Sequence, residues 1–207
     1  MNMIPLLEIS DFDFEKNFLL KKQNADDDVL EQCIKQYPSG ILDVFQECLD
    51  KHDPHIKLLD SAYFRLSNEK KYLNFIHDCF VENSTQCYLQ TCINFKSYED
   101  MIYFAERLDA IDKYLILNQL QYLDVTYSNT KRTYLIKDVD LLAMFVKGFI
   151  REVLHGVLVF KETPIAIYSN FDMSLPIVFF DTKNIDFYKN IAQKNDLFIR
   201  DFKSNKG

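Results

Sequence analysis

The chain has few glycines, four among 207 residues, and this scarcity excludes several classes of nucleotide-binding site. Both the dinucleotide-binding pattern Gly-x-Gly-x-x-Gly and the glycine-rich phosphate loop require glycines a few residues apart. The four glycines, which lie far apart in the sequence, are Gly40, Gly148, Gly156 and Gly207. The Gly-x-Ser-x-Gly turn of many serine hydrolases is missing as well. The five prolines are too few for long linkers or for a barrel with many tight turns.

Long apolar runs are also missing from the sequence. The most apolar stretch, residues 139–150, is interrupted by Asp140 and Lys147 and is shorter than the ~20 residues that a helix needs to cross a bilayer. The first residues have no basic segment ahead of their apolar ones, so they do not resemble a secretory signal. The five cysteines, which have no paired spacing, are Cys33, Cys48, Cys79, Cys87 and Cys92. We therefore expect reduced thiols in a cytoplasmic protein that does not associate with membranes.

Apolar residues make up 48% of the sequence, and from about residue 61 they recur in alternating helical and extended patterns. Helices are predicted at residues 67–80, 97–108, 138–153 and 181–192, with Ser67, Ser97, Asp138 and Asp181 as capping residues. Strands are predicted at residues 86–95, 113–117, 157–160, 164–168, 175–180 and 197–202. The loose alternation of residues 4–14 predicts either an edge strand or an arm.

Turn residues join some of these strands into predicted hairpins. Residues 169–172 have the composition of a turn, which predicts a hairpin between the strands on either side. A second hairpin is predicted between residues 113 and 136. Hairpins combined with helices predict an α+β fold, with a mostly antiparallel or mixed sheet of five to seven strands and amphipathic helices on at least one face.

Two further helices are predicted within the first 60 residues. The first follows the acidic residues 26–28 and has Leu30, Cys33, Ile34 and Tyr37 at helical spacing. The second begins near Ser39, ends by Pro54 and has Ile41, Val44, Phe45, Cys48 and Leu49 on one face. We expect this N-terminal helical pair to pack on the sheet. The prediction is a single domain, 1–207, with an acidic helical subdomain, 1–60, and an α+β body, 61–207.

The negative charge is concentrated at the N-terminal end of the sequence. The first 60 residues contain 13 acidic and 6 basic residues, whereas residues 61–207 contain 18 of each. The candidate partner-binding residues are Asp26, Asp27, Asp28, Glu31, Asp43, Glu47 and Asp50. The first three also suit the first turn of a helix, where acidic side chains are stabilising. Asp43, Glu47 and Asp50 are spaced to form an acidic stripe on the exposed side of the second helix.

This charge distribution predicts a basic protein partner. The net charge of −7 and the isoelectric point near 5.1 argue against nucleic-acid binding. In general character the chain resembles the small acidic immunity proteins with which bacteria neutralise toxins. The resemblance implies a non-enzymatic inhibitor, without a cofactor, that binds a basic toxin or effector. The alternatives are a structural or phage-type interaction protein, and an acidic surface that serves only solubility.

Two histidine motifs leave an enzymatic alternative open. The segment His52-Asp53-Pro54-His55 brings two imidazoles and a carboxylate together, as a small hydrolase or a metal-dependent enzyme with a dispersed site would need. However, Pro54 makes the segment a turn, so a solvated loop is the competing interpretation. In residues 77–79, helical spacing places Cys79 on the buried face and the histidine elsewhere, which favours a structural cysteine over a nucleophile.

Overall fold

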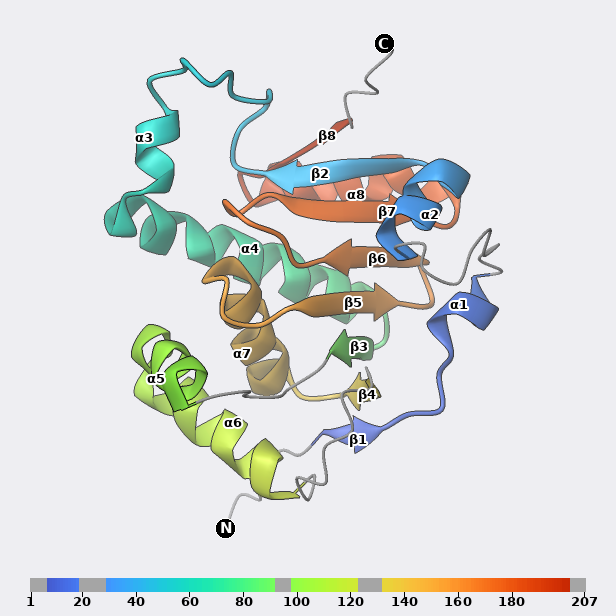
Figure 1. The fold of residues 1–207 in the computed structure, drawn as a ribbon. Helices are drawn as coiled ribbons and strands as arrows, with labels where there is room; N and C mark the ends of the chain where they lie inside the picture. Colours follow the sequence, from blue (N-terminus) through green and yellow to red (C-terminus); the bar gives the residue numbers. More distant parts are fainter. Residues whose placement is uncertain (1–6, 19–28, 92–97, 123–131, 202–207) are drawn as a thin grey trace.

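The structure is a computed structural model, which describes residues 7–18, 29–91, 98–122 and 132–201. The described residues form an eight-stranded sheet with the order β1-β4-β3-β5-β6-β7-β2-β8 (Figure 1). The strands are β1 (Glu8–Ile9), β2 (Ser39–Asp43), β3 (Cys87–Thr91), β4 (Arg132–Ile136), β5 (Gly156–Phe160), β6 (Ile165–Tyr168), β7 (Leu175–Phe179) and β8 (Phe198–Asp201). Every neighbouring pair is antiparallel, which confirms the α+β class, but the sheet has more than the predicted five to seven strands.

Helices cover both faces of this sheet. They are α1 (Phe14–Asn17), α2 (Val29–Gln36), α3 (Ile56–Leu59), α4 (Ala62–Glu82), α5 (Tyr98–Arg107), α6 (Ala110–Tyr122), α7 (Val139–Ile150) and α8 (Ile185–Lys194), with a 3₁₀ turn, η1 (Thr182–Asn184), before α8. On one face, residues of α4, α7 and α8 form the main core with alternate residues of the strands, such as Leu158 and Ile167. On the other face, Val159 and Ala166 pack with Cys33 of α2. The central strands are therefore apolar on both sides.

Two of the three helices that build the main core, α4 and α7, begin at side-chain caps. The side chain of Ser61 accepts a hydrogen bond from the backbone of Phe64, so α4 begins before the predicted cap at Ser67. Asp138 caps α7 as predicted and accepts bonds from the backbone of Asp140 and Leu141. Most residues predicted on the apolar faces of these two helices are buried: Tyr72, Phe75, Ile76, Cys79 and Phe80 on α4, and Leu142, Phe145, Val146, Phe149 and Ile150 on α7. Val153, predicted on the same face as the α7 residues, lies beyond the end of α7 and is only partly buried.

The predicted N-terminal helical pair is not present. The first predicted helix exists as α2. The prediction of the second helix is wrong, because residues 39–43 form β2 and no helix follows until α3. β2 lies between β7 and β8, where both edges of its backbone find antiparallel partners. A Cβ atom at Gly40 would lie 2.7 Å from the backbone oxygen of Arg200, so glycine permits the close approach of β8. Residues 1–60 thus contribute two strands to the sheet.

The strand predicted at residues 113–117 is also wrong. These residues lie in α6, so they do not supply the first strand of the hairpin predicted between residues 113 and 136, and residues 123–131 of that hairpin lie outside the described residues. A short apolar run is compatible with a buried strand or a helix, and its period alone does not distinguish them. The hairpin predicted around residues 169–172 is confirmed, because β6 and β7 pair antiparallel on either side of it.

Candidate functional site

Among the residues predicted to bind a partner, those that the structure describes do not form one surface. Asp26, Asp27 and Asp28 lie outside the described residues. Glu31 is exposed on α2, where its carboxylate lies 3.7 Å from the Lys35 amino group. Glu47 and Asp50 are exposed in the segment between β2 and α3. Because this segment is not helical, the stripe predicted from i, i+4 and i+7 spacing does not exist.

Asp43 differs from the other predicted contacts because it is buried, with 3% of the residue exposed. Its Oδ2 atom accepts hydrogen bonds from Nη2 of Arg200 at 2.8 Å and from Oγ of Ser174 at 2.9 Å. Asp43 therefore joins β2 to its neighbours β8 and β7, and a partner cannot reach it in this structure. A buried, paired carboxylate of this kind has a structural role.

The histidine motif at residues 52–55 forms a turn. Asp53 Oδ1 accepts a hydrogen bond from the His55 backbone at 2.8 Å and lies 2.7 Å from His55 Nδ1. The backbone bond, followed by the side-chain contact, lowers the pKa of Asp53. Within the described ranges, no three His, Cys, Asp or Glu side chains are grouped as metal ligands. In the motif at residues 77–79, Cys79 is buried, and burial raises the pKa of its thiol well above the usual value, opposite to an activated nucleophile.

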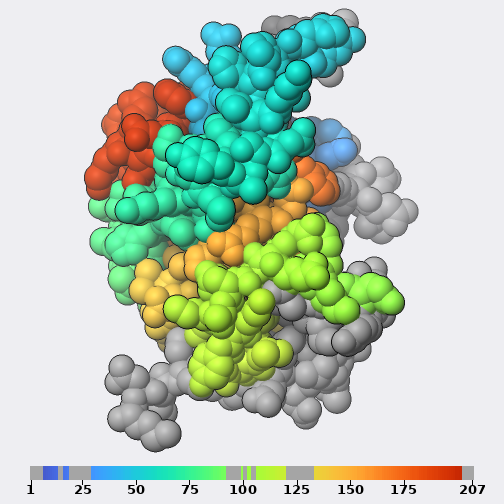
Figure 2. All heavy atoms as spheres, turned by 90° about the vertical axis from the view of Figure 1, so that its left-hand side faces the viewer, coloured from blue at the N-terminus to red at the C-terminus, as the bar shows by residue number. Residues whose placement is uncertain are grey.

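A different surface gathers exposed apolar side chains. Of the twelve large apolar residues that are exposed in the described part of the chain, eight lie on α3, the start of α4, α5 and α6. We call these eight the apolar helical face: Leu58, Tyr63, Leu66, Ile102, Tyr103, Ile111, Tyr114 and Leu117. The elements that bear them share the side of the molecule that faces the viewer in Figure 2. Exposed apolar groups collected in this way are typical of interaction sites.

α6 contributes the most exposed part of this face. Ile111, Tyr114 and Leu117 are 71%, 56% and 57% exposed, whereas Leu115 and Ile116, on the inner side of the same helix, are buried. A helix that is apolar on both sides is normally buried on both sides. The outer side of α6 therefore has the character of a surface that another molecule covers.

A groove with a volume of about 580 Å³ shares Leu66 with the apolar helical face. Its lining comes from the first turns of α4, the end of α5 and the end of α7: Ala62, Arg65, Leu66, Glu69, Glu106, Arg107, Leu108, Asp109, Ile150 and Arg151. Apolar and charged side chains both contribute. The volume lies in the range of about 300–1,000 Å³ that is common for binding pockets.

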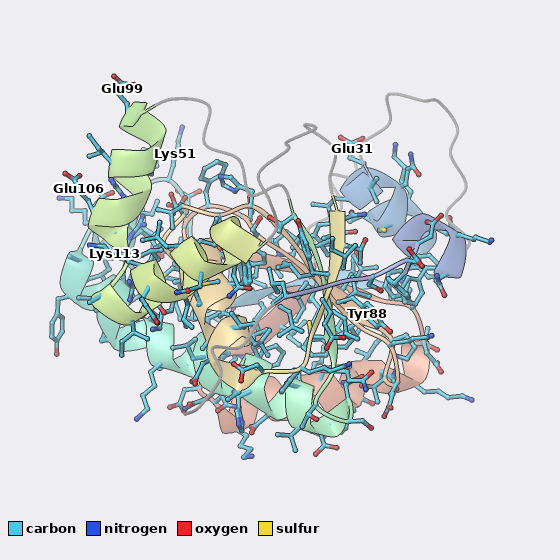
Figure 3. The ribbon with its side chains drawn as sticks, turned by 90° about the horizontal axis from the view of Figure 1, so that it is seen from below. Glu31, Lys51, Tyr88, Glu99, Glu106 and Lys113 are labelled. Carbon is cyan, nitrogen blue, oxygen red and sulfur yellow. The ribbon has the colours of Figure 1, made fainter. Side chains whose placement is uncertain are left out.

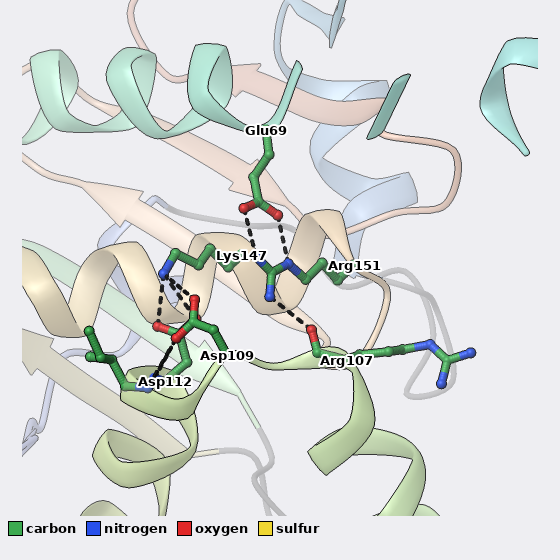
Figure 4. Close-up of polar contacts among 7 residues, drawn as sticks. Glu69, Arg107, Asp109, Asp112, Lys147 and Arg151 are labelled. Carbon is green, nitrogen blue, oxygen red and sulfur yellow. Dashed lines mark hydrogen bonds and ion pairs between the residues drawn. The ribbon is translucent and has the colours of Figure 1, made fainter. Parts of the chain in front are cut away.

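Arg151 connects the two walls of the groove (Figure 4). Its Nε and Nη2 atoms donate to the two carboxylate oxygens of Glu69 on α4, at 2.7 and 2.8 Å. Its Nη1 atom donates to the backbone oxygen of Arg107 at the end of α5, at 2.8 Å. Hydrogen bonding to Glu69 raises the pKa of Arg151, so the guanidinium stays charged. The spacing between α4 and α5 is thus fixed by the side chain of Arg151, the residue that follows α7.

Lys147, one turn earlier on α7, holds the start of α6 (Figure 4). Its Nζ atom lies 2.9 Å from Asp112 Oδ2 and 3.1 Å from Asp109 Oδ2. Burial raises the pKa of Asp112, against the opposing effect of its bond to Lys147. At Asp109 burial acts in the same direction, but hydrogen bonds from Asp112 and Lys147 outweigh it and lower the pKa. Burial would lower the pKa of Lys147, yet its bonds to both carboxylates raise it.

These charged groups hold the segments around the groove together. Arg65 of α4, which also lines the groove, donates to the backbone oxygen of Leu59 at 2.6 Å and to Glu152 at 3.1 Å. Each of these ion pairs therefore joins segments that lie far apart in the sequence. Such an arrangement suits a recognition surface with fixed walls.

The sequence did not reveal this surface, because it depends on which helices cover one another. The sequence does contain one signal. Residues 114–117 are all apolar and cover a full helical turn, and Ile111 precedes them by about one turn. Comparisons with protein-family models, curated proteins and solved structures found no match to this chain. Among the described helices, none combines the length and the apolar character required to span a membrane.

Proposed function

We propose that this chain is a non-enzymatic interaction protein that binds a protein partner through the apolar helical face. The gathering of eight exposed large apolar side chains on α3, α4, α5 and α6 carries this proposal. Burying apolar surface contributes about 25 cal/mol per Å², and aromatic anchors such as Tyr63 and Tyr114 are common at the centre of interfaces.

The partner that fits this chain best carries basic charge. The net charge of −7 favours such a partner and would accelerate its association. Glu47 and Asp50 precede α3 in a segment that packs against α4, where the rings of Phe45 and Phe64 stack 5.7 Å apart. Both acids are exposed in this segment, which contacts α4, one of the helices of the apolar helical face. An inhibitor or immunity-type protein directed at a basic toxin or effector is the form of this function that the charge supports.

The alternative of a hydrolase or metal-dependent enzyme at His52 and His55 has less support. The contact between His55 and Asp53 is accounted for by the turn that precedes α3. A catalytic site also needs a pocket in which the reacting groups converge, and neither histidine lines the groove between α4 and α5.

The proposal is tested by affinity capture from the cells that express the protein. The variant Ile111→Asn/Tyr114→Ser/Leu117→Gln removes the outer apolar side of α6. The control Val81→Asn/Val139→Thr/Phe171→Ser changes three exposed apolar residues outside the apolar helical face. We expect one stoichiometric protein to be captured by the wild type and the control and lost from the α6 variant, with unchanged circular dichroism. Capture of no such protein, or equal capture by both variants, would overturn the proposal.

A further inference from the structure

Most charges around the groove already have partners within the fold. Arg151 is paired with Glu69, Lys147 with Asp109 and Asp112, and Arg65 with Glu152. Within the described part of the chain, the exposed carboxylates of Glu99 and Glu106 on α5 have no such ion pair. Figure 3 shows both on α5, far from Glu31 on α2. Their charges are available to a binding partner.

These two acids form a regular pattern with the apolar residues between them. Glu99, Ile102, Tyr103 and Glu106 occupy positions i, i+3, i+4 and i+7 of α5, and all four are exposed. We call them the α5 stripe. Since a helix rises 1.5 Å per residue, the two acidic positions are separated by about 10 Å along the axis. The stripe is therefore apolar in the middle and acidic at both ends.

Arg107 adds a positive charge near one end of the α5 stripe, but the fold already uses it. Its guanidinium lies over the Tyr103 ring, 3.4 Å from the centroid, and its Nη1 atom donates to the backbone oxygen of Tyr103. A cation in this position is attracted to the face of the ring. Arg107 thus supports the orientation of Tyr103, and the acids remain the charges offered to a partner.

We infer that the partner segment is an amphipathic helix with a central apolar patch and two basic residues about seven positions apart. This inference rests on the proposed function and adds the chemistry of the partner. A helix places residues i and i+7 on one side, with i+3 and i+4 between them, so it matches the α5 stripe. In an extended segment, two residues ~10 Å apart are three positions apart in the sequence, so their side chains point to opposite faces. An extended segment therefore cannot present both basic residues to the α5 stripe.

The groove defines where a further apolar side chain of that helix, beyond the basic residue that pairs with Glu106, would anchor. Glu106 belongs both to the α5 stripe and to the groove lining, so the stripe leads into the groove. Next to it the lining contains Leu66, Leu108 and Ile150. A volume of about 580 Å³ accommodates one or more large apolar side chains. A basic residue paired with Glu106 would therefore neighbour an apolar anchor.

Two synthetic 18-residue peptides test the inference by fluorescence polarisation with the full chain. Both carry leucines at helical spacing; one has lysines seven positions apart beside the leucines, and the other has glutamates there. We expect the lysine peptide to bind at least about tenfold more tightly, with an affinity that falls as salt is raised from about 50 mM to about 500 mM. The variant Glu99→Lys/Glu106→Lys should weaken the lysine peptide at least about tenfold.

The matched control is Glu82→Lys/Glu162→Lys, which changes the net charge equally at exposed positions outside the apolar helical face. It should bind the lysine peptide within about twofold of the wild type. Equal weakening by the two charge variants, or no binding of the lysine peptide below about 100 µM, would overturn the inference. If the α6 variant loses the cellular partner while Glu99→Lys/Glu106→Lys keeps it, the inference fails and the proposed function stands. Retention of that partner by the α6 variant overturns the proposed function itself.

Discussion

α6 and α7 are neighbouring helices of similar length, 13 and 12 residues, but they differ in how much of their apolar surface is covered. α7 has eight buried residues and packs against α4, α6 and the sheet. α6 buries Leu115 and Ile116 against the body and leaves Ile111, Tyr114 and Leu117 exposed. Apolar content alone therefore does not distinguish a core helix from a helix that presents an exposed surface.

The largest expected effect contrasts an aromatic residue of each helix. Phe145 on α7 is fully buried, so Phe145→Ala should reduce the free energy of unfolding by about 3–5 kcal/mol. Tyr114 on α6 is 56% exposed, so Tyr114→Ala should change it by no more than about 0.5 kcal/mol. Urea unfolding of the full chain measures both. Comparable losses for the two variants would mean that α6 is as deeply packed as α7.

A smaller effect is expected where the two helices are joined by charge. Lys147→Met leaves the Asp112 carboxylate, whose side chain is 3% exposed, without its cation. We expect a loss of about 2–3 kcal/mol, because breaking a largely buried pair leaves an uncompensated charge. The double variant Lys147→Met/Asp112→Leu removes both charges and should recover part of that loss in the same urea measurement. A double variant less stable than Lys147→Met would contradict this account.

The core around α7 could be predicted from the sequence because its information is local. The apolar faces of α4 and α7 follow helical spacing, and β5, β6 and β7 are short apolar runs separated by turn residues. Residues 39–43 could not be assigned correctly in the same way. Their helical spacing is overruled by two strand partners, β7 and β8, that come more than 130 residues later in the chain.

The groove lies beyond sequence reasoning for a related reason. Arg151 and Glu69 are 82 residues apart, and Lys147 and Asp112 are 35 apart, so only the folded chain brings these charges together. The sequence also does not specify which of Glu47, Asp50, Glu99 and Glu106 share a surface. The α5 stripe has a regular spacing that the sequence contains, but its exposure depends on how α5 packs on the body. The spacing of its residues predicts that α5 is a helix, but the packing of α5 on the body determines which side of the helix is exposed.

The smallest effect is expected at the two capping residues, Asp109 and Asp138, which directly precede α6 and α7. Asp138 caps α7 by accepting from two backbone N–H groups, and Asp109 does the same for α6 while also pairing with Lys147. Because Asn is nearly as good a cap as Asp, Asp138→Asn should change stability by only a few tenths of a kcal/mol. Asp109→Asn keeps the cap but loses the ion pair, so about 0.5–1 kcal/mol should be lost at pH 7.

This last difference should depend on pH, with a direction fixed by the lowered pKa of Asp109. A carboxylate with a lowered pKa contributes its stability above the unfolded value of about 3.9, and that contribution is lost as the pH falls through the folded value. Thermal unfolding at pH 7 should therefore separate Asp109→Asn from the wild type, and the separation should shrink progressively below pH ~4. A difference that stayed constant down to the lowest pH at which the chain folds would assign the loss to the cap instead. The ion pair between Asp109 and Lys147 would then contribute less to stability than the burial of apolar side chains that distinguishes α7 from α6.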